Sequence, residues 1–177
     1  PKETILITGS DGQDGTLLFD FLKKKKVDII RVSKDKTFFN NKEVEHCNIL
    51  SNIDVSILFN KFKISEIYHL AAKVLSTENR KLDEDRGRSF IENFDVNVKS
   101  FHNILSNADK DMKIFYPTSS YIFAASNSKL NENSKISPSN LYGINKASAF
   151  WLAKYYRENF DLFVSTGIMF NHESRLR

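Results

Sequence analysis

The sequence predicts an α/β fold in which a doubly wound parallel sheet carries helices on both faces. Two observations predict it: short apolar, β-branched runs alternate with helical periodicity along the whole chain, and the first run leads directly into a cluster of glycines. The chain has 177 residues, of which 41% are hydrophobic and 27% are charged. Because this is the size and composition of an ordinary globular unit, we expect one domain over residues 1–177.

The first β-α-β unit occupies about thirty residues. Thr4–Thr8 is an apolar, β-branched run bounded by glycine, as is typical of a strand buried on both faces of a sheet. Apolar residues then recur at helical spacing over 17–22, and a second buried run covers Val27–Val32. These features predict a parallel pair of strands joined by a helix.

The same alternation continues to the end of the chain. Residues 126–140 interrupt it with Ser, Asn and Lys, which predicts a surface loop. Strands that alternate with helices imply a parallel sheet that is covered on both faces. The remaining predicted helices cover about 54–62, 90–108 and 141–160, and the remaining predicted strands cover about 66–70, 113–118 and 162–168.

Charge and cysteine content exclude several classes of function. The net charge is +4, but acidic residues interrupt the lysines, so we expect no nucleic-acid partner. The single cysteine, Cys47, and the four unclustered histidines predict no disulfide, no metal site and a cytoplasmic location. No apolar run approaches the ~18 residues of a membrane helix, and the sequence enters its first strand without a leader. We therefore expect no membrane or secretory role.

Gly9, Gly12 and Gly15 lie between the first strand and the first helix. In this context the spacing G-x-x-G-x-x-G predicts a Rossmann-type dinucleotide site. The first glycine permits a tight turn, the second lets backbone N–H groups approach a pyrophosphate, and the third lets the helix pack on the strand. The helix N-terminus adds a favourable dipole for the phosphates. An ordinary glycine-rich turn is the alternative.

Residues near the end of the second strand distinguish NAD from NADP. An acidic residue there binds the ribose hydroxyls of NAD, and a basic one binds the 2′-phosphate of NADP. Arg31 is basic, and Ser33 and Lys34 follow it closely, so we expect NADP. Asp28 lies too early for the acidic role, although a two-residue change in the strand boundary would leave NAD possible. In the alternative interpretation, Arg31 and Lys34 are solvated charges.

Tyr142 and Lys146 stand four residues apart at the start of a predicted helix, so they share a face. Because an ammonium favours a nearby phenolate, we expect Lys146 to lower the pKa of Tyr142 from ~10 toward neutrality. Tyr142 would then move the proton of a carbinol, while Ser119 binds the same oxygen. A chance pair on the surface is the alternative, but the glycine cluster upstream favours the catalytic interpretation.

With these motifs, the chain resembles an extended short-chain dehydrogenase/reductase, most closely the GDP-mannose 4,6-dehydratases and neighbouring nucleotide-sugar enzymes. The resemblance spans the whole chain, and the last segment is its most specific part. The segments that carry it are TGSDGQDGTLL (8–18), YHLAAKV (68–74), DVNVKSFHNIL (95–105), YPTSSYIFA (116–124), YGINKASAFWLAKYYRENF (142–160) and GIMFNHES (167–174).

The resemblance implies an NADP-dependent enzyme that modifies a nucleotide-diphosphate sugar through transient oxidation at C4, and that forms homodimers or homotetramers. It implies catalytic roles for Ser119, Tyr142 and Lys146, and it places Asn171 near the nucleotide-sugar. Asn97 matches an asparagine of the family, with a buried structural role as the alternative. The residues expected to bind the cofactor are Gly9, Gly12, Gln13, Asp14, Gly15, Arg31, Asn48, Ala71, Ala72, Tyr142 and Lys146.

The chain also departs from the family pattern. Tyr121 stands where the dehydratases have a glutamate that removes the C5 proton, and a tyrosine without its own lysine is a poor base near pH 7. Asn48 replaces the usual aspartate that reads adenine, and Ala124 replaces a glycine. The family's substrate-binding half normally continues beyond residue 177. Two alternatives therefore stay open: a nucleotide-sugar 4-keto reductase or epimerase that does not dehydrate, and a catalytically silent, truncated dinucleotide-binding module.

Overall fold

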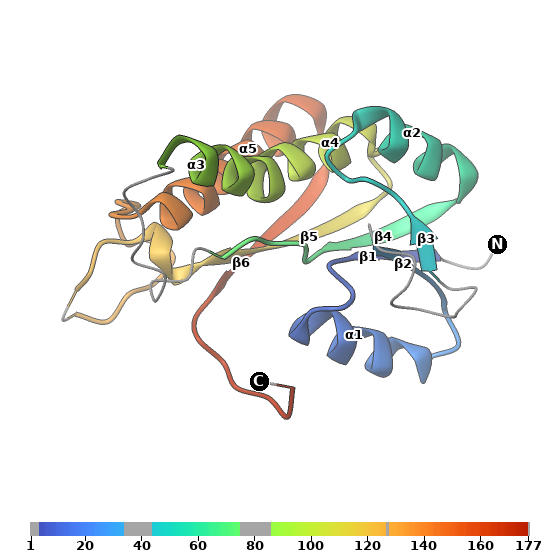
Figure 1. The fold of residues 1–177 in the computed structure, drawn as a ribbon, viewed down its shortest axis with the longest axis horizontal. Coiled ribbons are helices and arrows are strands. Elements are labelled where there is room, and N and C mark those ends of the chain that lie inside the picture. Colours follow the sequence, from blue (N-terminus) through green and yellow to red (C-terminus); the bar gives the residue numbers. More distant parts are fainter. Residues whose placement is uncertain (1–3, 34–43, 75–85, 127, 177) are drawn as a thin grey trace.

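Six parallel strands form one sheet in the order β3-β2-β1-β4-β5-β6 (Figure 1). The fold is that of a computed structural model, which describes residues 4–33, 44–74, 86–126 and 128–176. The predicted parallel α/β architecture is confirmed. The strands are β1 (Thr4–Thr8), β2 (Asp28–Ser33), β3 (Val44–His46), β4 (Ile64–His69), β5 (Lys113–Ser119) and β6 (Phe163–Met169).

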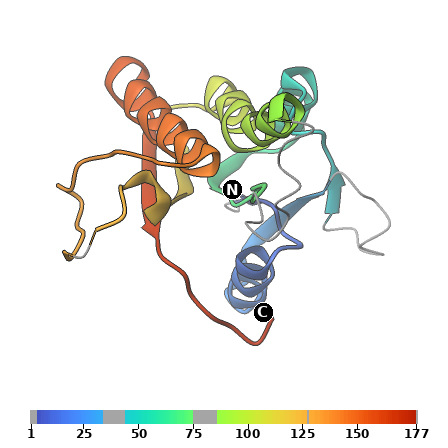
Figure 2. The ribbon, with the colours of Figure 1, turned by 60° about the vertical axis from the view of Figure 1, so that its left-hand side comes forward.

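The described helices cover both faces of the sheet, but unequally. Helix α1 (Gln13–Lys23) lies on one face, and the other described α-helices lie on the opposite face (Figures 1 and 2). None of the described helices has the length and apolar character needed to cross a membrane. The helices on the opposite face are α2 (Asn52–Lys61), α3 (Arg86–Phe94), α4 (Ser100–Asn107) and α5 (Leu141–Phe160).

The core follows from the alternation of side chains along each strand. Neighbouring side chains of β1 are buried on opposite faces of the sheet. Leu6 joins the large apolar cluster between the sheet and helices α2, α4 and α5, whereas Ile7 joins the small cluster between the sheet and α1. Both side chains are fully buried. A strand covered on both faces can be apolar at every position, which is why the first run of the sequence shows no polar alternation.

The sheet changes its direction of growth at β1. Strands β2 and β3 lie on one side of β1, and β4, β5 and β6 lie on the other. In register, Thr8 at the end of β1 lies beside Val32 of β2 and His69 of β4. A crevice opens where the connections from neighbouring strands leave in opposite directions, and ligands of open α/β sheets bind there.

Three elements differ from the sequence prediction. The predicted helix at 90–108 contains a π-helical turn, η2 (Asp95–Lys99), between α3 and α4. Strand β3 was not among the predicted strands, because three residues carry too little periodicity to be recognised. A 3₁₀ turn, η3 (Ser120–Ile122), lies between β5 and the predicted loop at 126–140, and Ser137 N in that loop donates to Ile122 O of the turn at 2.8 Å.

Candidate active site

The glycine turn has no room for side chains at two of its three glycines. Gly9 has φ = 63°, and a Cβ there would lie 2.5 Å from the backbone nitrogen of Ala71. At Gly15 a Cβ would lie 2.3 Å from the Gly9 carbonyl oxygen. Both positions therefore require glycine, and the close contacts bring the start of α1 against the ends of β1 and β4.

The first turn of α1 is suited to bind an anion. Gly12 is the N-cap residue, and no side chain accepts a hydrogen bond from the first-turn amides there. Such amides carry the positive end of the helix dipole, which matches the charge of a pyrophosphate. Gln13 and Asp14 belong to this turn, and Asp14 Oδ1 lies 2.8 Å from Nε2 of His172.

A cleft of about 800 Å³ opens beside the glycine turn at the carboxyl ends of β1, β2 and β4. Burial raises the pKa of the Cys47 thiol in its wall to about 11, so this thiol is neutral near pH 7. The side chain of Asn48 accepts a hydrogen bond from Leu50 N at 3.1 Å. The predicted cofactor residues that line the cleft are Gly9, Gly12, Asn48, Ala71 and Ala72.

Arg31 is not among the residues that line this cleft, and its contact with a 2′-phosphate stays a prediction. Its guanidinium donates to Ser10 O at 2.7 Å and lies 4.3 Å from the ring centroid of Phe19 on α1. Arg31 lies on the α1 face of β2 because side chains alternate along a strand. Ser33, two residues later, lines the cleft. Lys34 lies outside the described residues.

Ser119, Tyr142 and Lys146 come together at the carboxyl end of β5. Ser119 ends the strand, and its hydroxyl forms a hydrogen bond with the phenol of Tyr142. Lys146 lies one helical turn beyond Tyr142, with Nζ 5.8 Å from the phenol ring centroid. Asn140 caps α5 by accepting from Gly143 N at 2.7 Å, so the helix begins one residue before the tyrosine.

The pKa values of the pair differ from the sequence prediction. Burial raises the pKa of Tyr142, the hydrogen bond from Ser119 lowers it, and the nearby Tyr121 adds to the rise. Burial lowers the pKa of Lys146 to about 7. The expected depression of the Tyr142 pKa by Lys146 is therefore wrong for the protein without cofactor. A buried amine that is half neutral near pH 7 supplies too little charge to offset the desolvation of the phenol.

The amine of Lys146 donates hydrogen bonds to two oxygens of β5. Its Nζ donates to the hydroxyl of Tyr116 at 3.1 Å and to the carbonyl of Pro117 at 2.9 Å. The hydroxyl of Tyr116 in turn donates to the backbone carbonyl of Asn97 at 2.8 Å. Sequence reasoning missed Tyr116, because a tyrosine inside an apolar strand carries the same signal as any core aromatic.

Asn97 fastens the segment that follows β4. Its Nδ2 donates to Lys73 O at 2.8 Å, and Lys73 N donates back to its Oδ1 at 3.2 Å. Because Lys73 lines the cleft, the amide of Asn97 fixes the backbone of one cleft wall. The structure thus gives Asn97 the buried structural role that was the sequence alternative, and places it on the π-helical turn.

Tyr121 lies beside Tyr142. Its ring meets that of Tyr142 edge to face, with centroids 6.0 Å apart, and it is 48% exposed. A Cβ at Gly143 would lie 2.2 Å from the carbonyl oxygen of Tyr121, so only glycine lets α5 approach this turn. Sequence reasoning overlooked Gly143, although the tyrosine immediately before it is a usable signal.

Asn171 is exposed in the segment that follows β6. This segment returns toward α1 (Figures 1 and 2), where His172 contacts Asp14 and Arg175 Nη2 lies 3.3 Å from Asp20 Oδ2. The structure therefore brings Asn171 near the first turn of α1. It gives no contact that assigns Asn171 a ligand.

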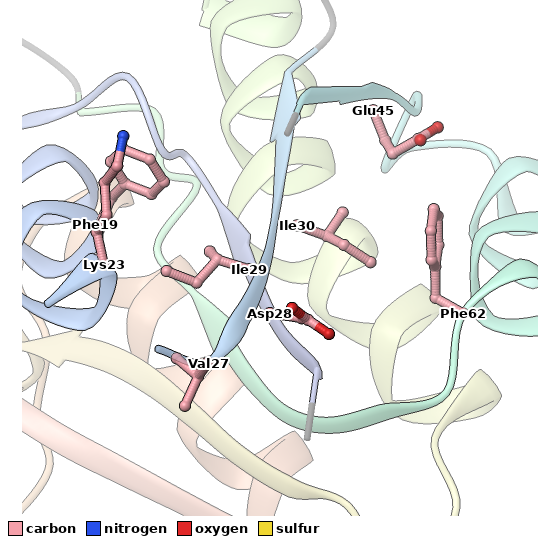
Figure 3. A pocket seen from close by; sticks show the side chains of 8 residues that line it. All are labelled: Phe19, Lys23, Val27, Asp28, Ile29, Ile30, Glu45 and Phe62. Atoms are coloured by element: carbon pink, nitrogen blue, oxygen red, sulfur yellow. The ribbon is translucent and has the colours of Figure 1, made fainter. Parts of the chain in front are cut away.

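A second hollow lies at the opposite end of β2 and is lined by none of the predicted site residues. It holds about 370 Å³, and Figure 3 shows Phe19 and Lys23 on one side of the strand and Glu45 and Phe62 on the other. The hollow is lined by Val27 and Asp28 at the start of β2, whereas the cleft lies where β2 ends. Among the described residues, no group of three or more His, Cys, Asp or Glu could hold a metal ion.

Comparison with known proteins matches this chain to one family. The family described as GDP-mannose 4,6 dehydratase has a sequence model that matches residues 6–177. GDP-mannose 4,6 dehydratase 2 of Arabidopsis thaliana is 27% identical over all of this chain and 52% of its own length. The GDP-mannose 4,6 dehydratase of Homo sapiens is 25% identical over all of this chain and 52% of its own length. The chain thus spans about half the length of these relatives.

Solved structures agree in fold. A monomeric L-threonine 3-dehydrogenase from a metagenome superposes with a TM-score of 0.77 and 28% identity, over 92% of this chain and 52% of its own. The dTDP-glucose 4,6-dehydratase of Bacillus anthracis, solved in complex with NAD, superposes with a TM-score of 0.78 and 17% identity. That match covers 99% of this chain and 57% of the other. At this identity the second likeness concerns the fold alone.

Proposed function

Because the chain belongs to the GDP-mannose 4,6-dehydratase family, we propose that it binds NADP and takes part in transient C4 oxidation of a nucleotide-diphosphate sugar. One observation carries the proposal. The hydroxyl of Ser119, the phenol of Tyr142 and the amine of Lys146 converge at the carboxyl ends of the strands, the edge where the glycine turn begins α1.

The residues present fit a dinucleotide. Gly9 and Gly15 exclude side chains from the turn, and the uncapped first turn of α1 offers amides to a pyrophosphate. NADP rather than NAD is supported by Ser33 in the cleft wall and by the basic Lys34 that follows it in the sequence. A bound nicotinamide would supply a hydride acceptor, and its positive charge when oxidised would favour the phenolate of Tyr142.

Each catalytic residue has a distinct task in this proposal. Oxidation of a carbinol removes a hydride from carbon and a proton from oxygen, which leaves a ketone. Tyr142 takes the proton, Ser119 holds the same oxygen by a hydrogen bond, and Lys146 stabilises the phenolate that begins the cycle. The reverse movement of the same proton serves reduction.

A second candidate is a 4-keto reductase or epimerase that does not dehydrate. Tyr121 supports it, because this half-exposed phenol lies against Tyr142 at the place where dehydration needs a carboxylate. No pKa shift of Tyr142 is attributed to any described carboxylate. Hydride transfer therefore has stronger support in this site than removal of the C5 proton.

The test incubates the protein with GDP-mannose and NADP⁺, and follows the sugar by mass spectrometry and the cofactor by absorbance. A 4-keto-6-deoxy sugar is expected for the dehydratase. An unchanged 6-hydroxyl with reduced cofactor supports the second candidate. The variant Tyr142→Phe, which keeps the ring, is expected to lose turnover by at least ~100-fold, the lower range of general acid-base catalysis, while it still binds NADP⁺.

Two outcomes contradict the proposal. Turnover that survives in Tyr142→Phe removes the phenol from the chemistry. Binding of NADP⁺ with no turnover of any nucleotide-sugar in the parent chain supports the catalytically silent dinucleotide-binding module instead. Tyr155→Phe is the matched control, because Tyr155 is a half-exposed phenol on the same helix.

A further inference from the structure

Tyr116 is a buried phenol beneath the proposed catalytic residues. It is fully buried on β5, and its ring stacks on Phe101 with centroids 4.2 Å apart and on His69 with centroids 5.9 Å apart. Apolar packing alone would be served equally well by phenylalanine at this position. The hydroxyl group therefore needs an explanation of its own.

The hydrogen bonds of this hydroxyl have a fixed direction. A phenol has one proton, and Tyr116 donates it to the carbonyl of Asn97 at 2.8 Å, because a carbonyl can only accept. The lone pairs of the phenol are then left for Nζ of Lys146 at 3.1 Å. Lys146 must donate in this contact, as it must to Pro117 O at 2.9 Å. Burial raises the pKa of Tyr116, so it stays a neutral acceptor.

Lys146 depends on these oxygens because it has no anionic partner among the described residues. The residue is 2% exposed, and no described carboxylate pairs with its amine. The titratable groups placed against it are His69 on β4, Tyr116 on β5 and Tyr142 on α5 itself. The ring of Tyr116 also faces the amine, with 4.5 Å from Nζ to the centroid. Neutral acceptors and an aromatic face thus hold the charged form.

We propose that Tyr116 is the positioning residue for Lys146: its hydroxyl, with its proton committed to Asn97, fixes the place of Nζ and favours the protonated amine over the neutral one. Two hydrogens of the ammonium are used by Tyr116 and Pro117, which leaves one that either the phenol of Tyr142 or a bound ligand can accept. The proposal rests on the proposed function only where it assumes that Lys146 stabilises the phenolate of Tyr142. The lysine contact itself is independent of any reaction.

The test measures the titration of Lys146 by NMR in the full chain labelled with ¹³C-lysine, assigned with Lys146→Met. Tyr116→Phe keeps the ring and removes the acceptor, so the protonated amine loses a hydrogen bond. The pKa of Lys146 is expected to fall by about one unit or more, as for loss of a hydrogen bond to a charged group. Tyr156→Phe is the matched control, because the hydroxyl of Tyr156 makes a part-buried bond, 3.1 Å to His102 Nδ1, away from the site.

An unchanged titration of Lys146 in folded Tyr116→Phe overturns the proposal, as does an equal shift in Tyr156→Phe. Should Tyr116→Phe fail to fold, a measurement on the parent decides: nuclear Overhauser contacts are expected between the Cε protons of Lys146 and the ring of Tyr116, and their absence overturns it. Where turnover is measurable, the acid limb of the oxidation profile is expected to move to higher pH in Tyr116→Phe. Absence of turnover in the parent would reject the proposed function, but the titration would still test the contact between Tyr116 and Lys146.

Discussion

Substitution of Gly15 by alanine tests how the glycine turn is built. The added Cβ would lie 2.3 Å from Gly9 O and 2.6 Å from Ser10 Cα, both backbone atoms that cannot rotate away. The first distance is about 0.7 Å short of the 3.0 Å below which Cβ contacts essentially never go, so α1 must move away from β1.

The expected cost follows from overpacking. Insertion of one methyl group into a tightly packed site costs roughly 1–3 kcal/mol, and the rigid backbone on both sides of Gly15 places this variant at the upper end. Gly12→Ala is the matched control. A Cβ at Gly12 meets only Gly9 O at 3.3 Å, and the backbone there, φ −73° and ψ 172°, is one that alanine adopts freely. Its cost is expected below about 1 kcal/mol.

The assay measures the free energy of unfolding in urea and the affinity for NADP⁺ by calorimetry, for both variants. Gly15→Ala is expected to lose both stability and affinity. Gly12→Ala is expected to keep stability but to bind about tenfold more weakly, ~1.4 kcal/mol, because its methyl group lies where the pyrophosphate approaches. Equal stability of Gly15→Ala and the parent would refute the reasoning, as would full NADP⁺ affinity in Gly12→Ala.

Three further predictions concern buried groups near the site. Lys146 has a pKa of about 7 in the folded chain and an ordinary value of 10.5, so the unfolded chain binds more protons between pH 7 and pH 10.5. The free energy of unfolding should therefore rise with pH over this range in the parent and stay flat by comparison in Lys146→Met. His69, bonded to Thr8 and Ser100, has its pKa lowered by burial to about 3; stability should fall as pH drops from about 6.5 to 3, more steeply in the parent than in His69→Gln. Gly143→Ala should cost roughly 1–3 kcal/mol in urea unfolding, because its Cβ would lie 2.2 Å from a backbone oxygen. No difference between variant and parent in any of these comparisons would contradict its premise.

Much of the fold could be predicted because its signals are local. A β-branched apolar run at Thr4–Thr8 and a long periodic segment at Leu141–Phe160 both appear in the structure with the predicted bounds. The π-helical turn at Asp95–Lys99 was not predictable in this way, since Asn97 in the turn bonds to Lys73 after β4 and to Tyr116 on β5, both distant in sequence. Periodicity alone carries no record of such contacts.

The candidate site divides along the same line. Ser119, Tyr142 and Lys146 were predicted from sequence spacing, and the structure brings them together. The sequence could not show that the guanidinium of Arg31 donates to Ser10 O and lies over the ring of Phe19, because both contacts join β2 to segments that precede it in the chain. Tyr116 was missed because its role depends on the direction of a single hydroxyl bond.

The central claim is that one ligand binds in the cleft beside the glycine turn and extends from there to the phenol of Tyr142. The most direct measurement is a titration of the ¹⁵N-labelled chain with NADP⁺, followed by amide chemical shifts. The largest changes are expected at Gly9, Gly12 and Asp14, together with changes at Tyr142 and Lys146. The claim would be contradicted by amide shifts that stay unchanged both at the glycine turn and at Tyr142. Shifts that change only around the hollow of Figure 3 would also contradict it.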